Sequence, residues 1–93
     1  MDWRVEFDPD ALRELRQLDR QVQRRVLGYL KERVLAREDP RQLGKALKGG
    51  LHGLWRYRVG DYRIVCAIQQ EVPRILVLRL AHRSEAYDRA STE

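Results

Sequence analysis

Three arginines lie on the same face of a predicted β-hairpin, and together they form a candidate anion-binding surface. Residues 54–68 alternate aromatic or β-branched residues with polar ones around Gly60–Asp61, which is typical of a hairpin with a two-residue turn. Such a turn pairs Arg58 with Arg63 and places Arg56 on the same face, because side chains alternate along a strand. Like charges directly opposite each other cost about a few tenths of a kcal/mol. We interpret this face as a surface for a polyanion; the alternative is a solvated sheet face in a basic protein.

The charge of the whole chain also favours an anionic partner. The 93 residues carry a formal net charge of +5, and the sequence pI is about 9.9. Most of the positive charge is arginine, whose planar and permanently charged guanidinium matches phosphate and carboxylate groups. The two partner classes that follow are nucleic acid and an acidic protein surface. The length predicts one domain, residues 1–93, with one modest core.

Several classes of chemistry are not expected from this sequence. Cys66 is the only cysteine, so no internal disulfide forms, and its place in an apolar pattern predicts a buried hydrophobe rather than a nucleophile. No Cys/His cluster has metal-ligand spacing, so neither a metal nor another cofactor is expected. No apolar run approaches the ~20 residues of a membrane span, and no signal-peptide core is visible. We therefore expect a cytoplasmic protein without membrane association.

Two amphipathic helices are predicted between a short first strand and the hairpin. Trp3, Val5 and Phe7 alternate with charged residues and predict the strand, and Asp8–Pro9 then begins a helix. Asp19 ends that helix and caps a second one, which stops before Asp39–Pro40. The apolar stripes of the two helices are Ala11, Leu12, Leu15 and Leu18, then Val22, Val26, Leu27, Leu30, Val34 and Leu35. We expect an antiparallel helix hairpin, with exposed arginines that mainly aid solubility: Arg13, Arg16, Arg20, Arg24 and Arg25.

The rest of the chain supplies the sheet that covers these stripes. The predicted apolar face of the hairpin consists of Trp55, Tyr57, Val59, Tyr62, Ile64 and Cys66. Residues 40–53 form a glycine-rich basic connection with one short helical turn, in which Lys45 and Lys48 are candidates to contact a phosphate backbone. The nearly continuous apolar run from residue 74 to 81 predicts a central strand that is covered on both sides, and a short helix or tail follows. The element order predicts an α+β fold with a small curved sheet and the helix hairpin on one face.

These residues resemble the RelE/ParE superfamily of toxins from type II toxin–antitoxin systems, and the RelE branch in particular. The resemblance covers essentially the whole chain, and its most specific parts are the Gly-Asp-Tyr-Arg hairpin and the His-Arg…Tyr ending. The segments that carry it are the strand 3–7 with Asp8–Pro9, the two helices, and residues 45–49, 54–65 and 81–87. The resemblance implies a RelE-like small curved antiparallel sheet with an N-terminal strand, a two-helix hairpin and a short C-terminal helix or tail.

The resemblance also implies an activity and a set of site residues. RelE-like toxins are ribosome-dependent mRNA interferases, metal-independent endoribonucleases that cleave mRNA in the A site by attack of the 2′-hydroxyl on the adjacent phosphorus. The family positions carry over to Arg63, Arg83 and Tyr87 as catalytic residues, with Arg56 and Arg58 gripping the RNA backbone. An ion pair of Arg63 with Asp61 or Glu85, and docking of the tail by Tyr87, are the structural alternatives.

The proton acceptor is where this chain departs from the best-known members. Those carry lysines on the strand before the turn, whereas this chain has Arg56 and Arg58, and arginine holds its proton too tightly to act as a base. The base is then Tyr87, His82 or water. His82 is a candidate acid or base that titrates near neutrality. His82 alternates in step with Leu76, Leu78 and Leu80, which also suits a buried structural histidine. His52 lies in the connection 40–53, before the hairpin.

Two other functions are open within or beside this resemblance. The ParE branch inhibits DNA gyrase by binding, without catalytic residues, and a catalytically weak member would act through partner binding alone. Either kind of toxin implies a cognate antitoxin. We expect an acidic antitoxin segment to cover the basic surface or to displace the tail 83–90. The resemblance further implies that the toxin–antitoxin complex binds promoter DNA through the antitoxin.

Overall fold

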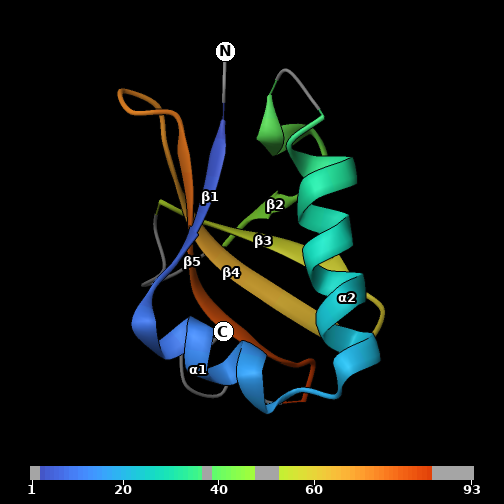
Figure 1. The fold of residues 1–93 in the computed structure, drawn as a ribbon. Coiled ribbons are helices and arrows are strands. Elements are labelled where there is room, and N and C mark those ends of the chain that lie inside the picture. Colours follow the sequence, from blue (N-terminus) through green and yellow to red (C-terminus); the bar gives the residue numbers. More distant parts are fainter. Residues whose placement is uncertain (1–2, 37–38, 48–52, 85–93) are drawn as a thin grey trace.

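Five strands form a single sheet in the order β1-β5-β4-β3-β2, and helices cover one of its faces (Figure 1). The computed structural model describes residues 3–36, 39–47 and 53–84. Its helices are α1 (Pro9–Gln17), α2 (Arg20–Gly28), the π-helical continuation η1 (Tyr29–Val34) and the 3₁₀ turn η2 (Pro40–Gln42). The strands are β1 (Arg4–Phe7), β2 (Lys45–Ala46), β3 (Leu54–Val59), β4 (Tyr62–Gln69) and β5 (Arg74–His82). The α+β fold expected from the sequence is therefore confirmed.

Both helix starts are fixed by the aspartates that the sequence indicated. The Asp8 carboxylate accepts a hydrogen bond from the backbone N–H of Asp10 at 3.1 Å, with Pro9 in the first turn. The Asp19 carboxylate accepts from the N–H of Gln21 at 3.3 Å. Each bond satisfies one of the amide groups that a helix leaves unpaired at its start.

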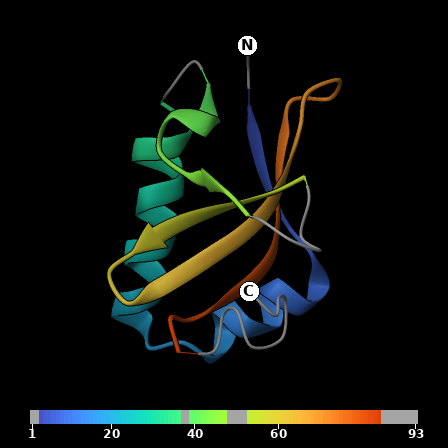
Figure 2. The same cartoon turned by 180° about the vertical axis from the view of Figure 1, so that it is seen from behind.

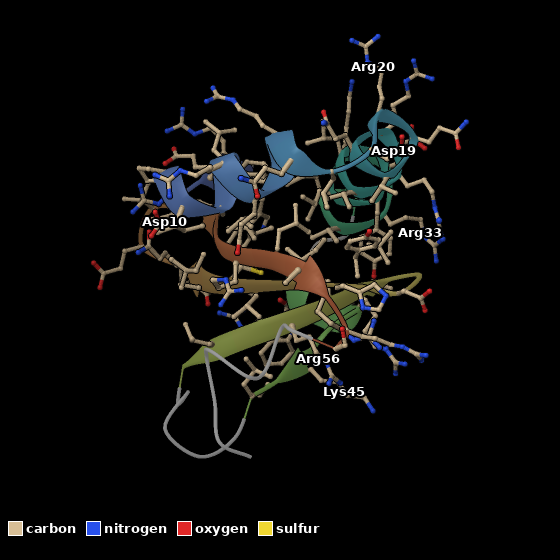
Figure 3. The ribbon with its side chains drawn as sticks, turned by 90° about the horizontal axis from the view of Figure 1, so that it is seen from below. Asp10, Asp19, Arg20, Arg33, Lys45 and Arg56 are labelled. Atoms are coloured by element: carbon tan, nitrogen blue, oxygen red, sulfur yellow. The ribbon has the colours of Figure 1, made fainter. Side chains whose placement is uncertain are left out.

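The two helices do not form the antiparallel hairpin that we expected. In Figures 1 and 2, α1 runs along one end of the sheet beside β5, while α2 crosses it at a steep angle. Leu18 and Asp19 have extended backbones, with ψ of 153° and 145°, and this short link redirects the chain. The apolar stripe of each helix therefore packs on the sheet rather than on the other helix. Figure 3 shows both helices on the same side of the sheet.

The β3–β4 hairpin has the predicted register, but the sheet as a whole is mixed rather than antiparallel. Arg58 lies opposite Arg63, and the other expected pairs are also present. β5 is an interior strand, with β4 antiparallel on one side and β1 parallel on the other. Among the described residues helices cover only one face of the sheet, so the cover on both sides that we expected for this strand is not found. The parallel pair arises because the chain passes through the helix layer between β1 and the remaining strands, and parallel strands need such a crossover.

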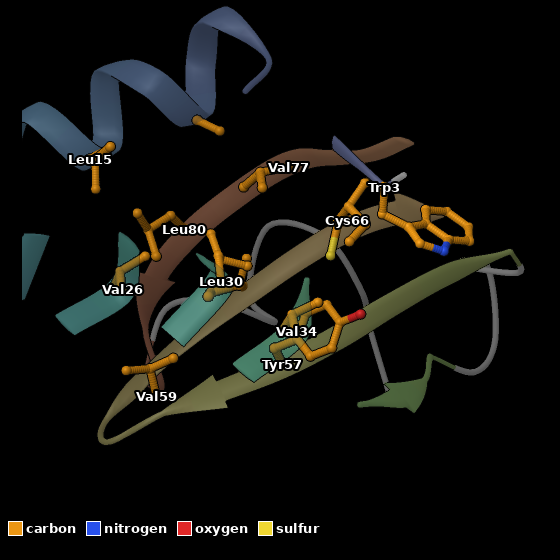
Figure 4. Packing of buried hydrophobic residues seen from close by; sticks show 13 residues of the cluster. Trp3, Leu15, Val26, Leu30, Val34, Tyr57, Val59, Cys66, Val77 and Leu80 are labelled. Atoms are coloured by element: carbon orange, nitrogen blue, oxygen red, sulfur yellow. The ribbon is translucent and has the colours of Figure 1, made fainter. Parts of the chain in front are cut away.

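The core lies between the helices and the sheet (Figure 4). Tyr57 is fully buried, and its hydroxyl donates a 2.6 Å hydrogen bond to the Pro40 carbonyl. Burial raises the pKa of this hydroxyl above its ordinary value and raises that of the buried Cys66 thiol to about 12. The buried cluster comprises Trp3, Ala11, Leu15, Val26, Leu30, Val34, Tyr57, Val59, Ile64, Cys66, Ile75, Val77 and Leu80. In the part of the chain that the structure describes, no helix is long and apolar enough to span a membrane.

An irregularity between β4 and β5 changes which residues of β5 face the core. Val65 pairs with Arg79, whereas the next residue, Cys66, pairs with Val77, so β5 has one extra residue at this point. Ile75 and Val77 are buried before the bulge, and Leu80 is buried after it. The alternation that predicted Leu76, Leu78 and Leu80 on one face therefore holds for Leu80 but not for the residues before the bulge.

Candidate functional site

The outer face of the sheet, away from the helices, carries a row of cations. Lys45 of β2 lies opposite Arg56 of β3, and the two appear side by side in Figure 3. Arg58 follows on the same face and is exposed, whereas Arg56 is half-buried. A hollow of about 90 Å³ at this edge of the sheet is lined by Lys45, Arg56 and Arg58 together with Gly44. These three predicted RNA-binding residues are thus brought together by strand pairing, including a strand that the sequence did not reveal.

Arg63 lies beneath the Gly60–Asp61 turn rather than extending into solvent. Only 6% of its surface is exposed. One terminal nitrogen donates hydrogen bonds to the carbonyls of Gly60 and Tyr62, each at 3.1 Å. Val65, two residues further along β4, is also buried, so the outer face is only partly solvated. The two hydrogen bonds hold the guanidinium of Arg63 in a fixed position against the turn.

Arg83 contacts the same turn from the end of β5. Its backbone N–H donates to the Asp61 carbonyl at 2.7 Å, and its Nε lies 3.9 Å from the Asp61 carboxylate. Both side chains are about two-thirds exposed. The ion pair that we considered for Arg63 with Asp61 is thus made by Arg83. Gly60 suits this turn because its φ of 58° is in the left-handed region that favours glycine.

His82 is half-exposed, so the buried structural histidine that we considered is not what the structure shows. Its Nδ1 accepts a hydrogen bond from the Ser84 N–H at 3.2 Å, and its ring packs edge-on against Tyr62 with centroids 5.6 Å apart. His82 lies opposite Tyr62, one position along from the Arg63–Ala81 pair, so it points to the other face of the sheet. It is separated from the arginines by the sheet itself.

The face of His82 opens into a cleft of about 760 Å³ between α1 and the ends of β4 and β5. Tyr62 and His82 line one side, and the Glu14–Arg79 ion pair lines another. The carboxylate of Glu14 accepts from Arg79 Nε at 2.9 Å and from the backbone N–H of Leu80 at 2.8 Å. Sequence reasoning missed this cleft because it depends on α1 lying along β5.

A second group of cations lies on the helices, and it includes Arg24 and Arg25, which we expected mainly to aid solubility. Arg24 and Arg25 of α2 and Arg33 of η1 surround a hollow of about 400 Å³ that also includes Gly28; we refer to these three residues as the helix arginine surface. Within the described segments, none of the three makes an ion pair. The Arg25 guanidinium lies over Gly60, since a Cβ built on that glycine would stand 2.8 Å from it. Positive charge therefore continues from the Gly60–Asp61 turn onto the helices.

Several predicted residues lie outside the described segments. These are Tyr87, Lys48, His52 and Glu85. The roles of Tyr87 and Lys48 remain predictions. The described residues contain no group of three or more His, Cys, Asp or Glu side chains arranged to hold a metal ion.

Comparisons with known proteins agree with this arrangement. A family model described as "ParE toxin of type II toxin-antitoxin system, parDE" matches residues 5–87. Toxin RelE of Mycobacterium tuberculosis is 32% identical over 85 residues, 91% of this chain and 86% of that protein. Toxin RelG of the same organism is 33% identical over 89 residues, 96% of this chain and 100% of that protein. The toxin–antitoxin complex RelBE2 from M. tuberculosis contains a similar chain, with a TM-score of 0.81 and 28% identity over 89% of this chain and 100% of that one.

The chain therefore belongs to the RelE/ParE superfamily, and it is a toxin of the type II toxin–antitoxin class. The resemblance described from the sequence is confirmed. The family model has the ParE description, whereas the two relatives are called RelE and RelG, so these names alone do not distinguish the RelE branch from the ParE branch.

Proposed function

We propose that this protein is a ribosome-dependent mRNA interferase of the RelE type. The observation that carries the proposal is the convergence of Arg63 and Arg83 on the Gly60–Asp61 turn, with Arg58 opposite Arg63. Cleavage by 2′-hydroxyl attack passes through a pentacoordinate phosphate that gains negative charge. Fixed cations stabilise such a transition state without a metal.

The residues divide into two roles in this proposal. Arg83, together with Arg63, stabilises the charge on the reacting phosphate. Arg56, Arg58 and Lys45 bind the neighbouring RNA backbone, a role that we extend to Lys48. Tyr87 stacks on a base or transfers a proton.

The helix arginine surface supports the dependence on the ribosome. Arg24, Arg25 and Arg33 lie on the helices, whereas Lys45 and Arg56 lie on the outer face of the sheet, so a partner that contacts both sets must reach two sides of the molecule. A large RNA assembly that surrounds the protein can do so, because phosphate contacts need only charge and proximity. We propose that these arginines contact ribosomal RNA while the outer face of the sheet holds the mRNA.

A cognate antitoxin is the second proposed partner. The similar chain in the RelBE2 structure is part of a toxin–antitoxin complex. The net charge of +5 favours an acidic antitoxin segment that covers the arginines of the sheet. In this proposal any binding of promoter DNA by the complex is provided by the antitoxin.

The test is mapping of mRNA 5′ ends on translating ribosomes with the wild-type protein and with Arg83→Ala. We expect cleavage within A-site codons by the wild type and a loss of about 10²–10³-fold in rate for Arg83→Ala, as for removal of one donor to a transition-state oxyanion. The matched control is Arg13→Ala, which removes an exposed arginine of α1.

Inhibition of DNA gyrase is the alternative that the ParE description of the family model favours. It predicts that the wild-type protein blocks supercoiling by purified gyrase and leaves mRNA on ribosomes intact. That pair of results would overturn the interferase proposal and make the arginine face a protein-binding surface.

A further inference from the structure

The proposed reaction needs a group that removes the proton from the 2′-hydroxyl, and the arginines of the site cannot do this. Of the described residues near them, His82 points to the opposite face of the sheet, and its Nδ1 already accepts a hydrogen bond from Ser84. Tyr87, the other candidate base, lies outside the described residues, and Asp61 is the described carboxylate beside Arg83. We propose that Asp61 is the general base of the cleavage reaction, an inference that rests on the proposed ribonuclease function.

The geometry of the turn places this carboxylate beside the cation that would hold the phosphate. The Asp61 carboxylate is 3.9 Å from Arg83 Nε, and the 2.7 Å backbone hydrogen bond from Arg83 to Asp61 keeps the two residues together. The terminal nitrogens of the Arg83 guanidinium are separate donors from Nε, so they are available to a phosphate. A 2′-oxygen poised for attack lies about 3–3.5 Å from the phosphorus, so in the proposed complex a phosphate held by Arg83 carries its 2′-oxygen toward the neighbouring carboxylate.

The exposure of Asp61 also suits this role. About two-thirds of its side chain is accessible, so an RNA strand on the outer face can reach it without a change of fold. Among the described residues, three cations lie at this turn: Arg83, Arg63 beneath it and Arg25 over Gly60. These cations offset the repulsion between the carboxylate and the RNA phosphates.

The proposed step can be written with all atoms assigned. Asp61 takes the proton of the 2′-hydroxyl, and the 2′-oxygen forms a bond to phosphorus with the freed electron pair. The bond from phosphorus to the 5′-oxygen breaks, and that oxygen keeps its electron pair and takes a proton from water. The products are a 2′,3′-cyclic phosphate and a free 5′-hydroxyl, and Asp61 returns its proton to solvent.

The experiment compares wild type, Asp61→Asn and Asp61→Glu in single-turnover cleavage of mRNA on ribosomes, with binding to ribosomes measured separately. Asparagine is accepted in tight turns, and the backbone bond to Arg83 is retained, so the fold is expected to persist. We expect Asp61→Asn to lower the cleavage rate about 10²–10⁴-fold with unchanged binding, and Asp61→Glu to recover part of the rate. Glu71→Gln, which removes a carboxylate from the exposed β4–β5 turn, is the control.

Chemical rescue by acetate distinguishes a catalytic carboxylate from a purely structural one. The smaller variant Asp61→Ala should regain activity when acetate is added, and the unrelated variant Arg83→Ala should not. Cleavage by Asp61→Asn within about threefold of the wild-type rate would overturn the assignment of Asp61 while leaving the ribonuclease intact. A loss of rate that parallels a loss of ribosome binding, or that acetate does not rescue, would also overturn it. Absence of cleavage by the wild type would instead overturn the proposed function, and this inference with it.

Discussion

The ion pair between Glu14 and Arg79 provides the sharpest test of how α1 is held on the sheet. β1 pairs with β5 only as far as Val77, and in the described part of the chain no strand lies beside the edge of β5 beyond that point. Glu14 replaces the missing strand, since its carboxylate accepts from the Leu80 N–H and from Arg79 Nε. We predict that Glu14→Gln, which keeps the side-chain shape and one acceptor oxygen, strongly destabilises the protein.

The magnitude follows from the burial of the pair. The two side chains are only 20% and 18% exposed, so removing one charge leaves the other in a poorly solvated place. Breaking a buried ion pair in this way costs about 3–5 kcal/mol, and the remaining exposure reduces our estimate to about 2–3 kcal/mol. For a domain of this size the melting temperature should then fall by about 10–20 °C.

Urea denaturation followed by circular dichroism measures this loss. The control is Arg13→Gln, which breaks the exposed Arg13–Asp10 pair of the same helix and should cost less than about 1 kcal/mol. The double variant Glu14→Gln/Arg79→Gln should recover at least about 1 kcal/mol, because it leaves no unpaired buried charge. A loss below about 0.5 kcal/mol for Glu14→Gln, or strictly additive effects in the double variant, would refute this account of the α1–β5 contact.

Two further predictions concern the core and its edges. Gly44→Ala should destabilise the protein by about 1–3 kcal/mol in urea denaturation, because its Cβ would overlap the Trp55 ring and stand 2.6 Å from a backbone carbonyl oxygen. Gly28→Ala, whose Cβ meets nothing within 4 Å, should instead stabilise the protein by about 0.5–1 kcal/mol, since alanine favours the helix. Equal changes in stability for the two variants would contradict this account of the contacts. Burial raises the pKa of Cys66 from 9.0 to about 12, so above pH 9 the unfolded chain loses a proton that the folded chain keeps, and stability falls as pH rises. Between pH 8 and 10 this thiol should account for about 1.4 kcal/mol of the decrease in unfolding free energy, and a Cys66→Ala variant that lost as much as the wild type over this range would exclude it.

The sequence predicted those parts of the fold that depend on local rules. The turn at Gly60–Asp61 set the register of β3 and β4, and the aspartates at positions 8 and 19 set both helix starts. The sequence also predicted that Arg58 would lie opposite Arg63. These features follow from turn chemistry, capping and side-chain alternation, which operate over a few residues.

The parts that escaped prediction depend on contacts between distant segments. The steep crossing of the helices and the parallel β1–β5 pair follow from how whole elements pack. The bulge in β5 shifts parity without any glycine or proline to mark it. The burial of Arg63 and its two carbonyl partners could not be inferred from a pattern that suggested an exposed cation.

The position of β5 in the sheet has a consequence for the synthesis of the toxin. The interior strand β5 is formed by residues 74–82, and it is the only partner of β1, at residues 4–7, in the sheet that the structure describes. A nascent chain that has not yet reached residue 82 therefore lacks the strand that joins its two ends. Pairing over such a long sequence separation comes late in folding, so we expect a growing chain to stay unfolded until this strand emerges. Truncated products of interrupted translation would then carry no assembled arginine face and would be harmless to the cell that made them.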